Sequence, residues 1–388
     1  MIGLQPTNKG FDPSKAILLL GALLLTVLFV SPLIWSSAEA SEGQQPPAQD
    51  GPDNETCFAC HASPDLQTEL SSGEILDLTV FPGAFDNSVH GMADLQCIQC
   101  HTEIEGYPHP PIQADTRREY TINQYRVCAD CHQEKYDETL DSVHSRALAG
   151  GNFNAAVCTD CHGAHDVRPP GEPRSQIAQT CRQCHTTIYD QYRDSVHGEA
   201  LIGQGNPDVP VCTDCHGVHS IEGPSADHEF RLFSPQLCAE CHADEELMAK
   251  YDISTNVFDT YVADFHGTTV TLFQQIAPGQ ETNKALCIDC HGVHDIIGVD
   301  DPDSPIIKEN LLNTCQKCHP DATTNFPSAW LGHYEPSPQN APIVYYVDLF
   351  YKIFIPAVLG GMAIFVIGDA GHRILQRRSK SEEEKSDE

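Results

Sequence analysis

The chain has 388 residues, enough for two or three ordinary domains, and only 7% of them are aromatic. Its formal net charge is −33 at pH 7, which excludes nucleic-acid binding because such a chain repels a phosphate backbone. With so few aromatic side chains, ordinary cores would not offset the conformational entropy of folding, so another source of buried apolar surface is needed.

Residues 1–40 are predicted to be a signal peptide. Lys9 and Lys15 precede an apolar run of 20 residues at 16–35, and the sequence Ala-Glu-Ala at 38–40 offers small residues for cleavage. We expect cleavage after Ala40 and export of the chain from residue 41 onward. An uncleaved anchor stays open as the alternative, because the apolar run is long enough to cross a bilayer.

Nine copies of C-x-x-C-H come after this segment, and they use all 18 cysteines of the chain. This motif is the attachment site of c-type haem: the two thiols form thioethers with the porphyrin, and the next His becomes an axial iron ligand. We number the motifs 1 to 9 in chain order and predict nine covalently bound haem c groups. The cysteines are Cys57, Cys60, Cys97, Cys100, Cys128, Cys131, Cys158, Cys161, Cys181, Cys184, Cys212, Cys215, Cys238, Cys241, Cys287, Cys290, Cys315 and Cys318. The motif histidines are His61, His101, His132, His162, His185, His216, His242, His291 and His319.

Zinc ribbons and disulfide frameworks also use paired cysteines, but neither needs a His directly after the second Cys. Here that His is present in every copy. The repetition therefore favours haem over zinc or disulfides at all nine motifs.

Residues 41–340 are predicted to form an extracytoplasmic domain that carries the nine haems. Motif 1 stands alone at 55–62, and four related units occupy about 85–335, each with two motifs and two further histidines. Two of the units begin SVHSRALAGG and SVHGEALIGQ and continue to CTDCHGAH and CTDCHGVH. We expect a mainly α-helical and irregular fold of repeated two-haem modules, with little β structure.

Eleven of the 20 histidines lie outside the motifs, and His372 among them follows the C-terminal apolar segment. The units supply eight candidates for the sixth iron ligand, and His333 or His228 could supply the ninth. His228 is interpreted as an ordinary surface residue. Nine such ligands would make every iron bis-histidine, six-coordinate and low in potential, with Met92 and Met248 left to packing. The predicted distal ligands are His90, His109, His144, His165, His197, His219, His266, His294 and His333.

Three of these distal candidates come directly after a motif in the pattern H-G-x-H. The second His lies three residues beyond the first and on much the same face, so it cannot reach the far side of the neighbouring haem. We therefore expect His165, His219 and His294 to ligate a different haem from the one attached beside them.

Residues 342–370 are predicted to form one transmembrane helix. The apolar stretch 343–367 has 25 residues, which span roughly 37 Å as a helix. Arg373, Arg377, Arg378 and Lys380 follow it, and the positive-inside rule then places the charged tail 371–388 in the cytoplasm. The expected location is the cytoplasmic membrane, crossed once, with the haem domain outside.

At CTDCHGAH, CTDCHGVH, CIDCHGVH and the SVHG segments, the chain resembles the multihaem c-type cytochromes of the cytochrome c3-like and doubled C-x-x-C-H families. The resemblance covers about residues 55–335 and implies electron transfer outside the cytoplasmic membrane, usually in anaerobic respiration. Tetrahaem cytochrome c3 also uses C-x4-C-H sites, and the quinol-oxidising tetrahaem cytochromes carry an N-terminal anchor; this chain departs from both.

The function we expect is an electron conduit with no catalytic residue of its own. Its partners would be an integral quinone-linked or cytochrome b-type membrane subunit and an extracytoplasmic redox protein. The alternative is a multihaem reductase of the nitrite, hydroxylamine or tetrathionate type, which needs an iron with an open position. The C-x-x-C-K motif of pentahaem nitrite reductases does not occur here. A filament subunit is disfavoured by the membrane anchor.

Overall fold

The computed structural model describes residues 51–223, 228–327, 333, 335–339 and 341–386. The chain divides into two units, Met1–Asp50 and Gly51–Glu388, and the second holds all nine motifs. The predicted signal peptide lies outside the described residues, so all the elements below belong to the second unit.

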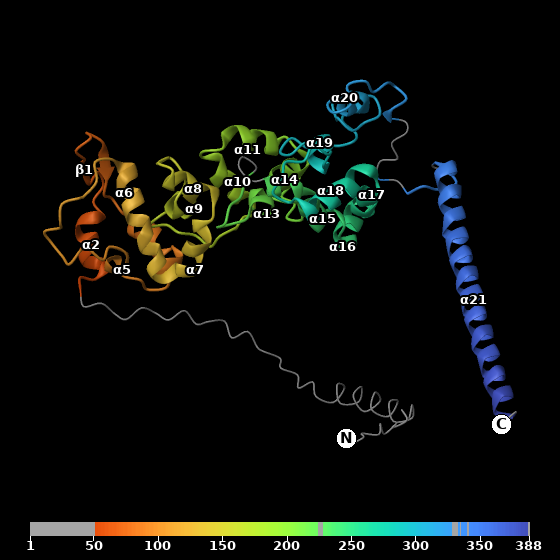
Figure 1. Cartoon of the computed structure of the whole chain (residues 1–388). Coiled ribbons are helices and arrows are strands. Elements are labelled where there is room, and N and C mark those ends of the chain that lie inside the picture. The colour runs from red at the N-terminus through yellow and green to blue at the C-terminus, as the bar shows by residue number, and fades with distance from the viewer. Residues whose placement is uncertain (1–50, 224–227, 328–332, 334, 340, 387–388) are drawn as a thin grey trace, which may run out of the picture. The chain divides into compact units, whose positions relative to one another are not determined.

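The described chain is mainly helical, as predicted, and its helices before the C-terminal one are short (Figure 1). Its one sheet is a two-stranded antiparallel hairpin, β1 (Gln67–Glu69) and β2 (Ile75–Asp77), in which Thr68 pairs with Leu76. The helices are α2 (Asn54–His61), α3 (Pro82–Asp86), α4 (Val89–Met92), α5 (Cys97–Cys100), α6 (Arg117–Gln124), η1 (Tyr125–Cys128), α7 (Ala129–Leu140), α8 (Val143–Ala149), α9 (Cys158–His162), α10 (Ser175–Arg182), α11 (Thr186–Arg193), α12 (Val196–Gly198), η2 (Glu199–Gly203), α13 (Cys212–His216), α14 (His228–Leu232), α15 (Ser234–His242), α16 (Glu245–Met248), η3 (Ala249–Tyr251), α17 (Val257–Ala263), α18 (Phe265–Ile276), α19 (Cys287–His291), α20 (Leu311–Gln316) and α21 (Pro342–Ser386).

The motifs occupy two different helical positions. Motifs 2, 4, 6 and 8 each begin a helix at their first Cys, in α5, α9, α13 and α19. Motifs 1 and 7 end the helices α2 and α15, motifs 5 and 9 begin in the last turn of α10 and α20, and motif 3 spans the junction of η1 and α7. The motif residues are therefore themselves largely helical.

A side chain inside each even-numbered motif starts its helix. Asp160 accepts a hydrogen bond from the Val157 amide at 2.7 Å, and Asp214 and Asp289 do the same at 2.6 and 2.8 Å in motifs 6 and 8. This satisfies an amide that the first turn of a helix leaves free. In motif 2, Gln99 takes the place of the aspartate.

A glycine ends three of these helices. Gly163, Gly217 and Gly292 have φ of 77°, 80° and 86°, a region that favours glycine because it has no Cβ. The chain reverses there, which makes the H-G-x-H sequence a turn and not a continued helix. The helical geometry assumed for these histidines in the sequence argument thus stops at the glycine.

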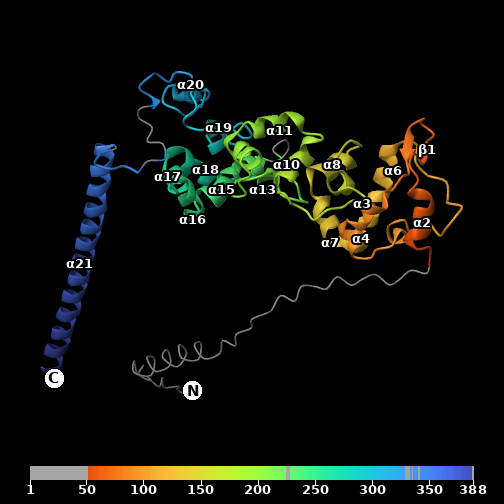
Figure 2. The ribbon, with the colours of Figure 1, turned by 180° about the vertical axis from the view of Figure 1, so that it is seen from behind.

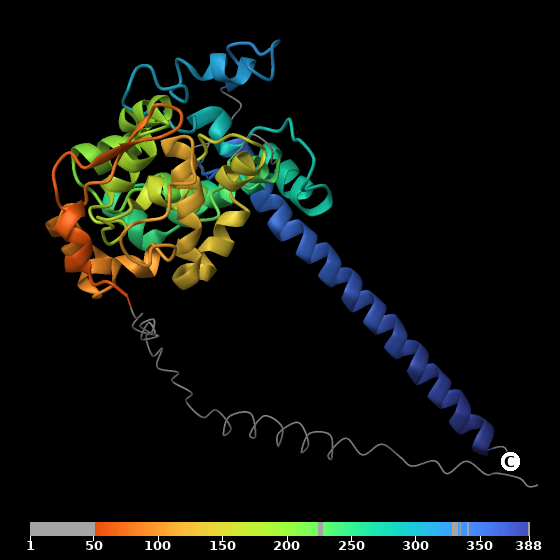
Figure 3. The same ribbon diagram turned by 90° about the vertical axis from the view of Figure 1, so that its left-hand side faces the viewer.

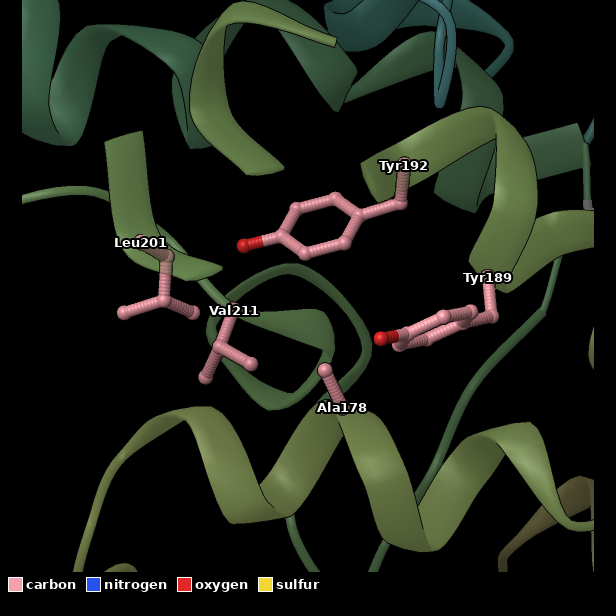
Figure 4. Packing of buried hydrophobic residues seen from close by; sticks show 5 residues of the cluster. All are labelled: Ala178, Tyr189, Tyr192, Leu201 and Val211. Atoms are coloured by element: carbon pink, nitrogen blue, oxygen red, sulfur yellow. The ribbon is translucent and has the colours of Figure 1, made fainter. Parts of the chain in front are cut away.

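Small hydrophobic cores hold neighbouring elements together. Figure 4 shows Ala178 of α10, Tyr189 and Tyr192 of α11, Leu201 of η2 and Val211 gathered in one cluster. The Tyr192 hydroxyl donates to the Pro210 carbonyl at 2.7 Å. The cluster explains why α10, α11 and α13 lie together, as Figure 2 shows from behind. A second cluster joins Leu232, Val270 and Leu286.

Backbone hydrogen bonds connect parts of the chain that are far apart in sequence. The amide of Val89 donates to Val167 at 2.9 Å, that of Val143 to Ile221 at 2.8 Å, and that of Val196 to Ile296 at 2.9 Å. Each donor precedes the distal histidine that opens a unit, and each acceptor follows an H-G-x-H turn. Successive units are therefore tied together by the same bond.

Helix α21 continues through Pro356 and reaches Ser386, beyond the predicted end at residue 370 (Figure 3). Its part Pro342–Gln376 is long and apolar enough to cross a membrane, with a mean hydropathy of 2.0 in an 18-residue window, a property that other helices can share. Asp348 and Lys352 form an i,i+4 ion pair of 2.7 Å near its start.

Candidate haem-binding sites

Each motif histidine faces one histidine from outside the motifs. The described residues contain nine such pairs, and their ring centroids are 5.9 to 6.3 Å apart. The pairs, in the order of their motifs, are His61 with His109, His101 with His165, His132 with His90, His162 with His219, His185 with His144, His216 with His294, His242 with His197, His291 with His333 and His319 with His266.

The pairs obey one rule along the four units. The first histidine of a unit faces the second motif of the same unit, as His144 faces His185. The second histidine of a unit faces the first motif of the preceding unit, as His219 faces His162. No unit precedes the first one, and its second histidine, His109, faces His61 of motif 1 instead.

The histidines of the H-G-x-H turns do not face the motif beside them. His165 lies opposite His101 at 6.1 Å, and His294 lies opposite His216 at 6.0 Å. The glycine turn directs each ring away from its neighbour and toward an earlier motif.

The ring of His333 lies 6.2 Å from that of His291 in motif 8, so His333 is the ninth candidate distal ligand. The side chain of His228 lies outside what the structure describes. Met248 is buried, with 6% of it exposed, whereas Met92 is 64% exposed.

The spacing of the rings fits an iron held between two imidazoles. An imidazole nitrogen bonds such a metal at about 2.0 Å and lies roughly 1.1 Å from its ring centroid, so two opposed rings should be roughly 6.2 Å apart. The nine observed separations lie around this value. Among the described residues, no group of three or more His, Cys, Asp or Glu side chains has the geometry of a metal cluster.

Hydrogen bonds fix the orientation of several rings. Nδ1 of His61 donates to the Leu78 carbonyl and Nδ1 of His216 to the Glu222 carbonyl, both at 2.8 Å. Nδ1 of His219 donates to the carboxylate of Glu138 at 3.1 Å. A proton held on Nδ1 leaves Nε2 as the nitrogen that can bind a metal.

Burial keeps many of these imidazoles neutral. It lowers the pKa of His197 to about 4, and the nearby His242 adds to the effect. Burial is also the main cause that lowers the pKa of His144, His165 and His291. A neutral imidazole is the form that binds a metal ion.

Neighbouring motifs touch through their cysteines. The thiol of Cys128, the first cysteine of motif 3, contacts the thiol of Cys158, the first cysteine of motif 4. The first cysteines of motifs 1 and 2, of motifs 5 and 6, and of motifs 7 and 8 make the same contact. The second thiols of the even motifs lie near the cysteines of the next motif, as Cys161 lies near Cys181. The motifs therefore form one unbroken series from 1 to 9.

Three arginines hold the motifs together in pairs. Arg118, before motif 3, donates to Asp160 of motif 4 at 2.9 Å from one nitrogen to both oxygens. Arg231, before motif 7, donates in the same way to Asp289 of motif 8 at 3.0 Å. Arg174 pairs with Asp214 and joins motifs 5 and 6.

The sequence prediction missed these arginines. Arg174 and Arg231 both precede the first Cys of their motif by seven residues, while Arg118 precedes Cys128 by ten. That recurrence, together with the aspartate in C-T-D-C-H and C-I-D-C-H, was the signal that could have revealed them.

The motifs, the helical fold and the paired imidazoles indicate a multihaem c-type cytochrome, a class of protein that transfers electrons. A family model described as the doubled CXXCH motif matches residues 151–188, which contain motifs 4 and 5. No curated protein and no solved structure matches the chain.

Proposed function

We propose that the chain is a nonahaem electron conduit, anchored in the cytoplasmic membrane by α21, with its haems on the outer side. The observation that carries the proposal is that all nine motif histidines face a second histidine. In this proposal every pair supplies the two axial ligands of one iron. Bound haem supplies reversible one-electron chemistry, and bis-histidine ligation keeps its potential low.

The contacts between motifs support transfer along the chain order. Each thiol becomes bonded to a porphyrin edge, so motifs whose thiols touch bring two porphyrin edges together. Because every motif has its cysteines in contact with, or near, those of the next motif from 1 to 9, electrons can pass stepwise between the two ends.

The membrane end is proposed to be at motif 9, which is the nearest in sequence to α21. An integral quinone-linked or cytochrome b-type subunit would exchange electrons there, and an extracytoplasmic redox protein would do so near motif 1. The nine complete pairs do not favour a reductase, which needs an iron with an open position. Full ligation instead favours carrying electrons over binding substrate.

The ligand assignment is tested by His219→Ala. The mature protein should keep nine haems by mass, and one iron should lose its distal ligand. That iron should be the one at Cys158, because His219 faces His162 and not His216. Carbon monoxide should bind to this iron in the reduced variant. Resonance Raman can identify the site by comparison with a second variant, His162→Met, which changes the motif histidine of the same haem. Binding at the Cys212 haem would refute the assignment.

The anchor is tested by ending the chain after Asn340. The shortened protein should be soluble, with nine haems and an unchanged spectrum, and membranes should no longer reduce it with quinol. Reduction by quinol and membranes at the normal rate would show that α21 only tethers the protein. A protein that carries zinc in place of even one haem would contradict the uniform interpretation of the motifs.

A further inference from the structure

The histidine that faces motif 1 is held differently from the others. His109 lies in the segment 101–116, which contains no helix or strand, and its side chain is exposed. Its Nδ1 bonds the Gly106 carbonyl of its own loop at 3.0 Å. The hydrogen bonds of residues 105–112 all stay within residues 105–113, whereas Gln124 and Asn123 of α6 bond Glu103 and Gln113 near the two ends of the loop, at 3.3 Å each.

Seven other distal histidines are fixed by their surroundings. His90, His144, His197 and His266 lie on the helices α4, α8, α12 and α18. The remaining three lie in H-G-x-H turns, three residues from a motif histidine. His333 is also tied to another element, since its Nδ1 lies 3.5 Å from the Thr260 hydroxyl of α17.

A loop with few bonds to its surroundings opens at a small free-energy cost. Pro108, Pro110 and Pro111 add to this because they have no amide to donate. Tyr107, which contacts the His109 ring edge-on at 6.0 Å, is itself 91% exposed and adds little restraint.

The loop also forms a surface pocket of about 450 Å³. Glu103, Glu105, Tyr107, Pro108 and Pro110 line it. The charges of Glu103 and Glu105 repel an anion that approaches this pocket and leave a neutral molecule unaffected. The ligand that fits these surroundings is small and uncharged.

We propose that His109 is an exchangeable ligand, and that the motif 1 haem takes a small uncharged iron ligand in its place. The bond from Nε2 of His109 to the iron breaks and a bond from the ligand to the same iron forms. No electron is transferred in this step, and His109 moves away with its loop. This inference rests on the proposed function, because it assumes that His109 otherwise completes the motif 1 site.

The test uses carbon monoxide on the reduced full-length protein, monitored by the Soret change and by the amount bound. The wild type should bind one molecule per nine haems, at a rate that saturates as the carbon monoxide concentration rises, because His109 must leave first. His109→Ala should also bind one, at a rate that increases linearly. His165→Ala, which opens a tethered site, should bind two.

Each other result has a distinct meaning. If the wild type binds none and His109→Ala binds one, the exchange is refuted while the conduit survives. If His109→Ala binds two and His333→Ala binds one, the exchangeable site is at motif 8 and the proposal is overturned. If His109→Ala binds none, His109 is not a ligand, and the proposed ligand set fails as well.

Azide binding to the oxidised protein at low ionic strength tests whether Glu103 and Glu105 exclude anions. The double variant Glu103→Gln, Glu105→Gln should bind azide at least twofold more tightly than the wild type, and the gain should disappear in high salt. Its affinity for carbon monoxide should not change. An equal gain for both ligands would refute the selection for uncharged ligands.

Discussion

Replacing Arg174 by Gln should loosen the segment that leads into motif 6. Arg174 donates to the Val209 carbonyl at 3.3 Å and pairs with Asp214. Asp214 in turn accepts from the amide of Val211, whose side chain is only 2% exposed in the Ala178 cluster. The arginine thus holds both ends of the short segment 209–214.

The size of the effect depends on the exposure of the pair. The side chains of Arg174 and Asp214 are 36% and 38% exposed, so solvent screening reduces the ion pair to about 0.5 kcal/mol. The long hydrogen bond to Val209 adds about 0.5 kcal/mol. Loss of about 1 kcal/mol corresponds to a roughly fivefold more frequent local opening.

Hydrogen exchange with mass spectrometry on the haem-loaded protein measures this opening. Peptides that cover 209–216 should exchange about five times faster in Arg174→Gln, with all nine haems retained. Arg193→Gln is the matched control, because Arg193 pairs with Asp190 and Asp194 on the exposed side of α11. Unchanged exchange at 209–216, or an equal increase in the control, would refute the reasoning.

Two further substitutions probe the repeated elements. In Gly198→Ala the new Cβ would collide with the Tyr192 backbone carbonyl, so the free energy of local opening of α12, measured by hydrogen exchange, should fall by about 1–3 kcal/mol. Gly203→Ala is the control and should have little effect, because the nearest atom to its new Cβ is 3.7 Å away. In Tyr261→Phe the Ala285 carbonyl loses a donor at 3.0 Å. The free energy of local opening before α19 should therefore fall by about 1 kcal/mol, and hydrogen exchange there should become faster. An unchanged exchange rate would show that water replaces the hydroxyl.

The sequence predicted the coarse fold because its signals are local. C-x-x-C-H marks each motif without reference to the rest of the chain, and the motif residues are themselves largely helical. The single long apolar C-terminal helix was also evident, although the continuation of α21 to Ser386 was not. Charged residues after residue 370 are compatible with a helix and do not mark its end.

The two positions of the motifs on their helices were not predicted, because the motif itself is the same in both. The difference comes from the residues around it. Asp160, Asp214 and Asp289 accept a hydrogen bond from the amide before their motif, so a helix begins there. Motif 3 also contains an aspartate, Asp130, yet lies at a helix junction. The aspartate is therefore not sufficient by itself, and in motifs 4, 6 and 8 it also pairs with Arg118, Arg174 or Arg231.

Which histidine rings face each other could not be read from sequence, because the pairs join residues up to 78 positions apart, such as His216 and His294. The bond from Val143 to Ile221 and its equivalents set that distance through the packing of whole units. Sequence spacing alone had left the pairing open.

The pairing rule explains why the array has one extra motif and one extra histidine. A unit gives its second histidine to the preceding unit, so four units leave a motif without a partner at one end and a histidine at the other. Motif 1 and His333 complete these ends. The array should therefore tolerate the loss of one whole unit. Deletion of 142–194 joins Asp141 to Ser195 and restores the sequence Asp-Ser-Val-His.

The shortened protein should carry seven haems, with seven distal histidines left to serve them. His219 should then face His101, since motif 2 becomes the first motif of the preceding unit. Mass spectrometry counts the haems, and the amount of carbon monoxide bound should equal that of the wild type. A seven-haem protein that binds one carbon monoxide more would show that His219 recognises motif 4 itself. Equal binding would mean that position in the array, and not the identity of the motif, selects the partner.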